Sequence, residues 1–440
     1  MADAAPRPRQ LLVGTAAHNS HVQNMVRALY DAGALYGYFS AGVDVWHGPA
    51  TREARRWVGS RMPQLDRELS RRAVDAVPEE LVHPRWRWEL LRVAAGRIAP
   101  ASRVEDWLWE RGERDLDRLC ARIVRRVDVG GFFGVEHGSL EAIATARSLG
   151  KPTIVAFLSP HRMTRARWVD AEFARHPELG TATRRKLDDL GEARDARRDE
   201  EARLADWIVS GSSFTTRSLV DAGFPDKKIL TVPLGGPEPV PEAVVPARRP
   251  DTLRFIYAGP VSVRKGAHYL LQAWASAAPS QAELHFYGKP LLPEQMLAAA
   301  KAAPGGDRVF FHGSVPARVL GQIYLDGSLL MLPTLCDGFG QVVSDALAHG
   351  LPVLTTANAG AADCIEAGVS GFVIPPANAD AIAERLTWCA AHRDDLFAMR
   401  RAALARAGAW TWVDFRKQFA AKVCAAMNAT IAAAEQHALA

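Results

Sequence analysis

The chain has 440 residues, of which 48% are hydrophobic and 23% are charged, and it carries a formal net charge of +5. A length well beyond about 250–300 residues favours two domains, and this ordinary composition excludes the disordered, fibrous and disulfide-scaffold classes. The mild excess of positive charge suits an anionic small molecule, a lipid headgroup or a nucleic acid equally well, so it does not decide between them.

The cysteines and the apolar runs indicate the cellular compartment of the protein. Five cysteines are scattered along the chain with no pair at metal-ligand or redox spacing, which favours a reducing cytosol. The apolar run at 11–17 is short and lacks a convincing cleavage site, so we expect a first strand there and not a signal peptide. No segment approaches the roughly 18 apolar residues of a membrane helix. We expect a cytoplasmic protein, with peripheral attachment to the inner face of the membrane as the alternative.

The first half of the chain alternates strand and helix patterns, which is the unit of a parallel sheet. Strands are expected at 11–13, 131–135, 152–158 and 207–210, with helices at 22–32 and 140–149. Between about 51 and 126, arginines are concentrated together with five of the twelve tryptophans, which predicts a helical insertion. Residues 178–205 are dense in charges of both signs, as in a long solvated helix.

A proline-rich stretch at 233–250 predicts the linker between two domains. After it we expect strands at 253–258, 283–287, 309–312, 329–333 and 352–355, and helices at 267–277, 294–303, 319–324 and 342–349. The predicted fold is α/β, with two Rossmann-like, doubly wound domains that face a cleft. They cover 1–238 and 250–405, and a last helix at 410–440 is expected to pack back on the first domain.

Two loops of the second domain carry the chemistry. The first holds Arg264 and Lys265 between Gly259 and Gly266, just before a predicted helix. Two cations beside a helix N-terminus are suited to holding a diphosphate, although an ordinary turn with surface cations gives the same pattern. We expect Lys265→Ala to abolish donor binding and to leave the fold intact.

The second loop precedes the helix predicted at 342–349. Gly338 and Gly340 allow the backbone to approach a ligand, and free N–H groups around Phe339, Gln341 and Val342 favour an anion there. Asp337 in the loop and Asp345 in the helix are placed to bind different hydroxyls of one sugar nucleotide, on the sugar and on the ribose. The alternatives are a carboxylate that only favours the helix dipole and an ordinary surface residue.

This second domain resembles the donor-binding domain of family-four retaining glycosyltransferases, which have the GT-B fold. The resemblance rests on two acidic residues eight positions apart around a Gly-Phe-Gly loop, and on four further motifs: Lys265-Gly266, 312–316, 350–353 and 371–375. It implies a nucleotide-diphosphate sugar as donor, with no metal and no cofactor. It also implies that Asp337 is catalytic and that the donor is bound by Gly259, Arg264, Lys265, Val315, Gly338, Phe339, Gly340, Gln341, Val342 and Asp345.

The chain departs from the family pattern at three positions. The family has glutamate at both acidic positions, where this chain has Asp337 and Asp345, and it has an arginine where this chain has Pro260. Arg264 is the candidate replacement for that arginine. The shorter side chain of Asp345 requires a closer backbone or a bridging water to reach a ribose.

In the first domain, His161 follows a predicted strand and is the first candidate for a catalytic residue that positions the acceptor. Relatives often have a histidine there, followed some ten residues later by a glutamate, which is Glu172 here. A loop histidine satisfied by local backbone is the alternative, and His137 and His18 are rival candidates.

The predicted activity is that of a retaining hexosyl- or glycosyltransferase of class EC 2.4. It would act on a glycan or lipid-linked acceptor in polysaccharide, lipopolysaccharide or glycoconjugate biosynthesis. The alternative is a weak or inactive GT-B scaffold that binds a nucleotide or a partner. The chain contains no recognised nucleic-acid-binding motif, so no nucleic acid is expected as partner.

The segment Arg85-Trp86-Arg87-Trp88 has the composition of a peripheral contact with an anionic membrane. The alternative is that the tryptophans pack beneath amphipathic helices and the arginines face water.

Overall fold

The computed structural model describes residues 10–17, 19–40, 77–98, 103–180 and 182–439, together with residues 53, 56, 57, 60 and 61. The rival candidate His18 and much of the predicted insertion at 51–126 therefore lie outside the described residues.

The first sheet has seven parallel strands in the order β3-β2-β1-β4-β5-β6-β7. The order reverses between β1 and β4, and in such sheets a ligand binds beside the carboxyl ends of the strands at this switch point. The strands are β1 (Leu11–Thr15), β2 (Leu35–Ser40), β3 (Val82–Pro84), β4 (Gly131–Val135), β5 (Thr153–Phe157), β6 (Trp207–Ser210) and β7 (Ile229–Thr231).

Helices cover both faces of this sheet. The described α-helices are α1 (Ser20–Asp31), α4 (Arg87–Ile98), α5 (Arg103–Arg126), α6 (Leu140–Ser148), α7 (Arg162–Arg165), α8 (Ala171–Arg175), α9 (Ala182–Leu204) and α10 (Ser213–Asp221). Helix α5 buries Leu116, Cys120 and Val124 against β1, β4 and β5. The second half of the predicted insertion is therefore also a layer of the core.

The second sheet has six parallel strands in the order β10-β9-β8-β11-β12-β13. They are β8 (Leu253–Ala258), β9 (Ala282–Tyr287), β10 (Val309–Gly313), β11 (Leu329–Leu332), β12 (Val353–Thr356) and β13 (Gly371–Ile374). The helices of this domain are α11 (Ala267–Ala277), α12 (Glu294–Ala302), α13 (Ala317–Asp326), α14 (Gln341–Ala348), α15 (Ala379–Ala391) and α16 (Arg393–Gly408). The predicted fold class of two Rossmann-like domains is confirmed by the two parallel sheets.

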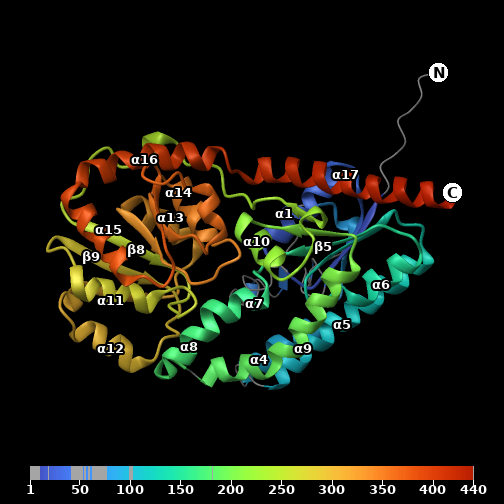
Figure 1. The fold of residues 1–440 in the computed structure, drawn as a ribbon, viewed down its shortest axis with the longest axis horizontal. Helices are drawn as coiled ribbons and strands as arrows, with labels where there is room; N and C mark the ends of the chain where they lie inside the picture. Colours follow the sequence, from blue (N-terminus) through green and yellow to red (C-terminus); the bar gives the residue numbers. More distant parts are fainter. Residues whose placement is uncertain are drawn as a thin grey trace.

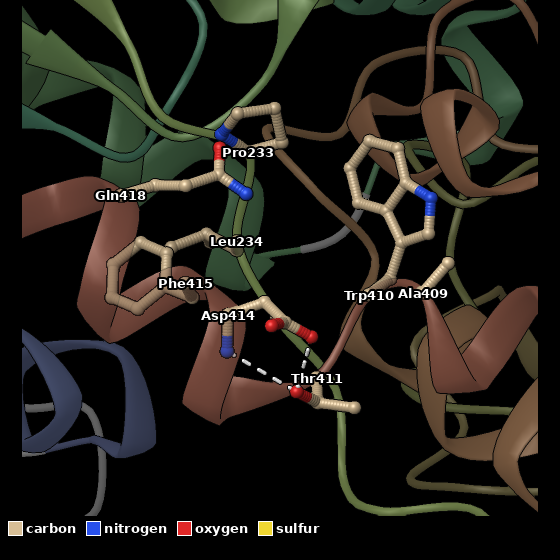
Figure 2. Close-up of a pocket in the computed structure, with 9 residues that line it drawn as sticks. Pro233, Leu234, Ala409, Trp410, Thr411, Asp414, Phe415 and Gln418 are labelled. Atoms are coloured by element: carbon tan, nitrogen blue, oxygen red, sulfur yellow. Dashed lines mark hydrogen bonds between the residues drawn. The ribbon is translucent and has the colours of Figure 1, made fainter.

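The chain crosses between the sheets twice, and the two crossings are bonded to each other. Gly236 in the proline-rich stretch donates its N–H to the Trp410 carbonyl at 2.7 Å, and it accepts from the Trp412 N–H at 2.9 Å. A pocket of about 230 Å³ opens beside this crossing, with Pro233 and Gln418 on one side and Trp410 on the other (Figure 2). One buried apolar cluster runs from the first sheet through Leu234 to α14.

After the second crossing, helix α17 (Trp412–Leu439) runs back along the first domain and packs on α1 (Figure 1). The ring of Phe419 lies 5.6 Å from that of Phe133 in β4, and the Trp207 indole donates to the Thr430 hydroxyl at 2.8 Å. No helix in the described part of the chain combines the length and the hydrophobicity needed to cross a membrane.

We expect Phe419→Ala to lower the free energy of unfolding by about 3–5 kcal/mol, because it removes a fully buried ring from the first domain. Lys417→Ala, at an exposed position of the same helix, should change it by less than about 0.5 kcal/mol. Urea unfolding followed by tryptophan fluorescence measures both. Equal effects of the two substitutions would contradict the docking of α17 on the first sheet.

Candidate active site

The two predicted ligand loops meet at one edge of the second sheet. They follow β8 and β11, which are neighbours in the sheet. Lys265 Nζ donates to Asp337 Oδ2, and Arg264 Nη1 lies 3.5 Å from Asp337 Oδ1. Arg264 also donates to the Cys336 carbonyl at 3.1 Å. The structure thus brings Arg264, Lys265 and Asp337 together, and we call these three residues the charged cluster.

Glycine makes this close approach of the two loops sterically feasible. Gly266 has φ 70°, and a side chain there would collide with the Pro333 carbonyl of the second loop. Gly340 has φ 90° and precedes α14, and a Cβ atom there would lie 3.2 Å from Asp337 Oδ2. Both backbones need the left-handed region, which glycine adopts without strain.

The charged cluster is buried around its central pair. The side chains of Lys265 and Asp337 are 11% and 12% exposed, whereas that of Arg264 is 45% exposed. Burial opposes ionisation of Asp337, but the charges of Lys265 and Arg264 hold the pKa of its carboxyl below the usual value. Burial also lowers the pKa of Lys265, and Asp337 opposes that effect. Arg264 is the cation with its surface open to a ligand.

The start of α14 completes the anion-binding character of this edge. Gln341 and Val342 form its first turn, where backbone N–H groups have no partner within the helix and the dipole is positive. The buried ring of Phe339 belongs to the apolar cluster beneath the loop, and the donor-binding role of this residue stays a prediction.

Asp345 lies deeper on α14, in a group of polar atoms with unused bonding capacity. Burial raises the pKa of Asp345 to about 6, and a hydrogen bond with the Gln341 side chain opposes the rise. Within the described residues, Gln341 Oε1 and the hydroxyl of Tyr324 are buried without a hydrogen-bond partner. The Tyr324 ring lies 5.6 Å from that of His349, whose Nδ1 lies 2.7 Å from the Asp345 carbonyl, so Tyr324 and Asp345 are close. Unpaired buried polar groups are costly and point to an absent ligand.

Two predicted donor residues lie at the same sheet edge without joining the charged cluster. The Gly259 N–H is bonded to the Tyr287 carbonyl at 2.8 Å, and the Pro260 carbonyl accepts from the Tyr257 hydroxyl at 2.7 Å. Val315 is half-buried in the connection between β10 and α13. The structure places both residues at carboxyl ends of strands, and their donor-binding role stays a prediction.

The first domain contacts the second loop directly. Ser212 Oγ donates to the Gly338 carbonyl at 2.7 Å, and a side chain on Gly338 would collide with the Leu158 carbonyl. Ser213 donates its N–H to Asp363 Oδ2 at 2.8 Å. These contacts close the cleft at the point where α10 begins.

Glu172 makes a further contact between the domains. Its carboxylate lies 3.0 Å from His268 Nε2 at the start of α11, and it also accepts from Arg175 at 2.5 Å. The glutamate predicted to follow His161 therefore acts across the cleft.

His161 itself is engaged within the first domain. Its Nε2 lies 2.8 Å from Asp199 Oδ1, and its Nδ1 accepts from the Met163 N–H at 3.3 Å. Burial lowers the pKa of His161, and Asp199 opposes this. Nδ1 thus caps the start of α7 and Nε2 is paired with α9, so both ring nitrogens are satisfied, and the catalytic role of His161 stays a prediction.

Two other histidines of the first domain have unused ring nitrogens. His137 follows β4 at the switch point, with a strained φ of 87° that Glu201 supports by accepting its N–H at 2.8 Å. His21 lies on α1, where burial lowers its pKa and the charge of Asp337 opposes that effect only in part. Burial lowers the pKa of each histidine to about 4, so both are neutral at pH 7. Within the described residues, Nδ1 of each is buried without a partner.

Residues 252–392 match the protein family described as "Glycosyl transferases group 1". The second domain belongs to the group 1 glycosyltransferases. The resemblance predicted from the motifs around Asp337 is therefore confirmed for this domain. Among the described residues, no group of three or more His, Cys, Asp or Glu has the arrangement of a metal site.

Curated proteins of similar sequence match parts of this chain. A D-inositol 3-phosphate glycosyltransferase of Segniliparus rotundus is 26% identical over 169 residues, which are 38% of this chain and 35% of that protein. A sucrose synthase of Acidithiobacillus caldus is 43% identical over 72 residues, which are 16% of this chain and 9% of that protein. The chain thus covers about a third or less of the length of either relative.

Solved structures match nearly the full length of the chain. Anabaena HepE in complex with UDP has a TM-score of 0.59 at 16% identity, and the match covers 94% of this chain and all of HepE. Sucrose-phosphate synthase from Thermosynechococcus elongatus has a TM-score of 0.61 at 17% identity. The match covers 96% of this chain and 100% of that protein. These likenesses confirm the predicted GT-B fold.

The buried ion pair changes the outcome expected for Lys265→Ala. Removing one partner of a buried pair leaves an uncompensated charge, so we expect this variant of the glycosyltransferase domain to lose about 3–5 kcal/mol of unfolding free energy. Arg264→Ala, at a half-exposed position, should lose less than about 1 kcal/mol. Thermal and urea unfolding of both variants provide the test, and the reverse order of stability would contradict the burial of the pair.

Proposed function

We propose that the protein transfers a sugar from a nucleoside-diphosphate sugar to an acceptor hydroxyl, with retention of configuration at the anomeric carbon. The observation that carries the proposal is the charged cluster of Arg264, Lys265 and Asp337 beside the N-terminus of α14. The match to HepE in complex with UDP supports a uridine nucleotide as the first donor to test. Biosynthesis of a polysaccharide, lipopolysaccharide or glycoconjugate is the proposed setting.

In the proposed donor complex, the diphosphate takes over the cations that now face Asp337. A diphosphate carries more negative charge than one carboxylate and presents several oxygens, so it can bind Arg264 and Lys265 together with N–H groups of the α14 start. Asp337 then becomes available to bind hydroxyl groups of the donor sugar. The ion pair keeps the two loops in position until the donor arrives.

The polar group around Asp345 is the proposed ribose site. A ribose has two neighbouring hydroxyls, which can donate to the Asp345 carboxylate and to Gln341 Oε1 and can accept from the Tyr324 hydroxyl. These contacts would satisfy the two polar atoms that are buried without partners. The Tyr324 hydroxyl would thus supply a hydrogen bond to the ribose that the short side chain of Asp345 does not make.

In the transfer step, the bond between the anomeric carbon and the diphosphate oxygen breaks while the acceptor oxygen bonds to the same face of the sugar. The acceptor proton passes to the departing diphosphate oxygen. The sugar acquires oxocarbenium character, and negative charge grows on the diphosphate. Arg264, Lys265 and the α14 start would stabilise that charge by preorganised electrostatics.

The first domain is proposed to bind a glycan or lipid-linked acceptor. His137 and His21 are neutral and have an unused ring nitrogen, so either can accept a hydrogen bond from an acceptor hydroxyl. His161 stays a candidate that would act by holding the start of α7. A cytoplasmic location stays a prediction.

A nucleotide-binding scaffold without transferase activity is the second candidate function. Two observations favour it. Pro260 replaces an arginine of the family pattern, and the Asp337 carboxylate is already paired with Lys265 and Arg264. Hydrolysis of the donor sugar in the absence of acceptor distinguishes the two functions, because a scaffold binds the nucleotide without breaking the glycosidic bond.

Isothermal titration with UDP, GDP and ADP, followed by hydrolysis of the matching nucleotide sugars, tests the proposal. We expect at least one diphosphate to bind, and Arg264→Ala to weaken it about tenfold or more, through loss of a charge-assisted hydrogen bond. Lys417→Ala removes a positive charge from exposed α17 and serves as the matched control. Absence of diphosphate binding would contradict both candidate functions, and binding without hydrolysis would contradict the transferase.

The raised pKa of Asp345, about 6, predicts a pH dependence of donor use. The carboxylate is charged above pH 6 and becomes protonated below it, so the apparent KM for the nucleotide sugar should rise as the pH falls from 8 to 5. Asp345→Asn should have a raised KM that varies little over this range. A wild-type KM that is constant between these pH values would contradict the role of Asp345.

A further inference from the structure

Helix α4 presents apolar side chains to solvent. Leu91 is 54% exposed and Ile98 is 87% exposed, and Leu90 and Ala94 are exposed on the same side of the helix. Positions 90, 91, 94 and 98 follow the spacing of one helical face. The orientation of α4 is therefore the reverse of that of an ordinary surface helix, which turns its apolar side towards the protein core.

Two partly buried ion pairs fix α4 in this orientation. Arg92 donates to Glu89 at 2.6 Å on its own helix and to Glu105 of α5 at 3.1 Å. These three side chains are only 18–26% exposed, so the polar side of α4 is turned towards α5. Rotating the helix to hide the leucines would break these contacts and expose the charges. The apolar face is therefore a stable feature of the fold.

The apolar surface continues onto α5, which packs against α4 as a hairpin. Trp107 is 53% exposed, and its ring lies 6.1 Å from that of Trp88. Six of the fifteen exposed large hydrophobic residues in the described part of the chain belong to this hairpin and its entry: Trp86, Leu90, Leu91, Ile98, Val104 and Trp107. We call these six residues the α4–α5 face.

Cations accompany the α4–α5 face. Arg87, Arg103 and Arg111 are exposed, and within the described residues no ion pair joins any of them to a carboxylate. The guanidinium of Arg111 lies 5.3 Å from the centre of the Trp107 ring. By contrast, Glu89, Glu105 and Glu110 of the hairpin are all paired with arginines. The free charge beside the apolar side chains is therefore positive.

We propose that the α4–α5 face docks on the surface of an anionic lipid bilayer. Exposed Leu and Ile enter the boundary of the acyl chains, Trp is favoured at the interface, and unpaired Arg binds lipid phosphates. A second copy of this chain fits the face less well, because a two-fold contact would set the same arginines against each other. Helix α4 lies in the lower part of the molecule in Figure 1, on the other side of the first domain from α17.

Co-sedimentation of the full chain with phosphatidylcholine vesicles, with and without phosphatidylglycerol, tests this surface. We expect binding to the anionic vesicles that falls as salt is raised. Leu91→Ser with Trp107→Ser should weaken it by about tenfold or more. Arg103→Gln with Arg111→Gln should remove the preference for phosphatidylglycerol. The matched control is Val244→Ser with Val369→Ser, which changes two exposed valines outside the hairpin and should leave binding unchanged.

Every substituted side chain is exposed, so we expect the variants to fold, and their unfolding midpoints check this. Failure of the wild-type chain to bind either vesicle would overturn the proposal, as would equal weakening by the valine control. Sedimentation velocity tests the alternative occupant of the α4–α5 face, a second copy of this chain. A wild-type dimer that the Leu91→Ser and Trp107→Ser changes dissociate, without vesicle binding, would assign the face to self-association instead. Diphosphate titration is independent of these outcomes, so the surface and the donor site are tested separately.

Discussion

The candidate site depends on one electrostatic contact, the buried ion pair between Lys265 and Asp337. The two residues come from loops that follow neighbouring strands, and Gly266 allows those loops to touch. An ion pair removed from water is stable only while both charges are present. The groups proposed to recognise a diphosphate therefore also hold the local fold in the absence of donor. Arg264, at the more exposed edge of the cluster, can change partner with less structural cost.

The second loop also joins the two domains. Its Gly338 carbonyl accepts from Ser212 of the first domain, and Glu172 reaches His268 at the start of α11. The crossings at Gly236 and Thr411 are bonded as a short parallel bridge, so the chain is constrained where the domains meet. Domain closure commonly completes a transferase site and excludes water. Here the loop proposed to bind the donor is itself a contact surface of the closed cleft.

Much of the second domain could be predicted from the sequence, because its strands are short apolar runs and its helices have clear periodicity. The strand at 253–258 and the helix at 267–277 were predicted with the bounds that the structure gives. Strands β2, β3, β7 and β13 were not predicted. Two of them have three residues, and β2 has a mixed composition with a glycine at its centre.

The site was predicted less completely, for physical reasons that differ between residues. Lys265 and Asp337 are 72 positions apart, so their charges could be assigned to a common ligand but not to each other. Tyr324 belongs to a helix that packs on the sheet, where an aromatic residue is ordinarily core. His21 lies on an amphipathic helix without a motif, and only the fold brings it under the influence of the Asp337 charge. His161 had the expected position, but Asp199 and the Met163 N–H occupy its ring, which local sequence does not reveal.

The most direct test of the proposed diphosphate site is a structure determined from crystals of the protein soaked with UDP. The account predicts that the diphosphate oxygens lie within hydrogen-bond distance of Arg264, Lys265 and the first N–H groups of α14, and that Asp337 has released Lys265. A nucleotide bound elsewhere, or one bound at the α14 start while the Lys265–Asp337 pair stays intact, would contradict it.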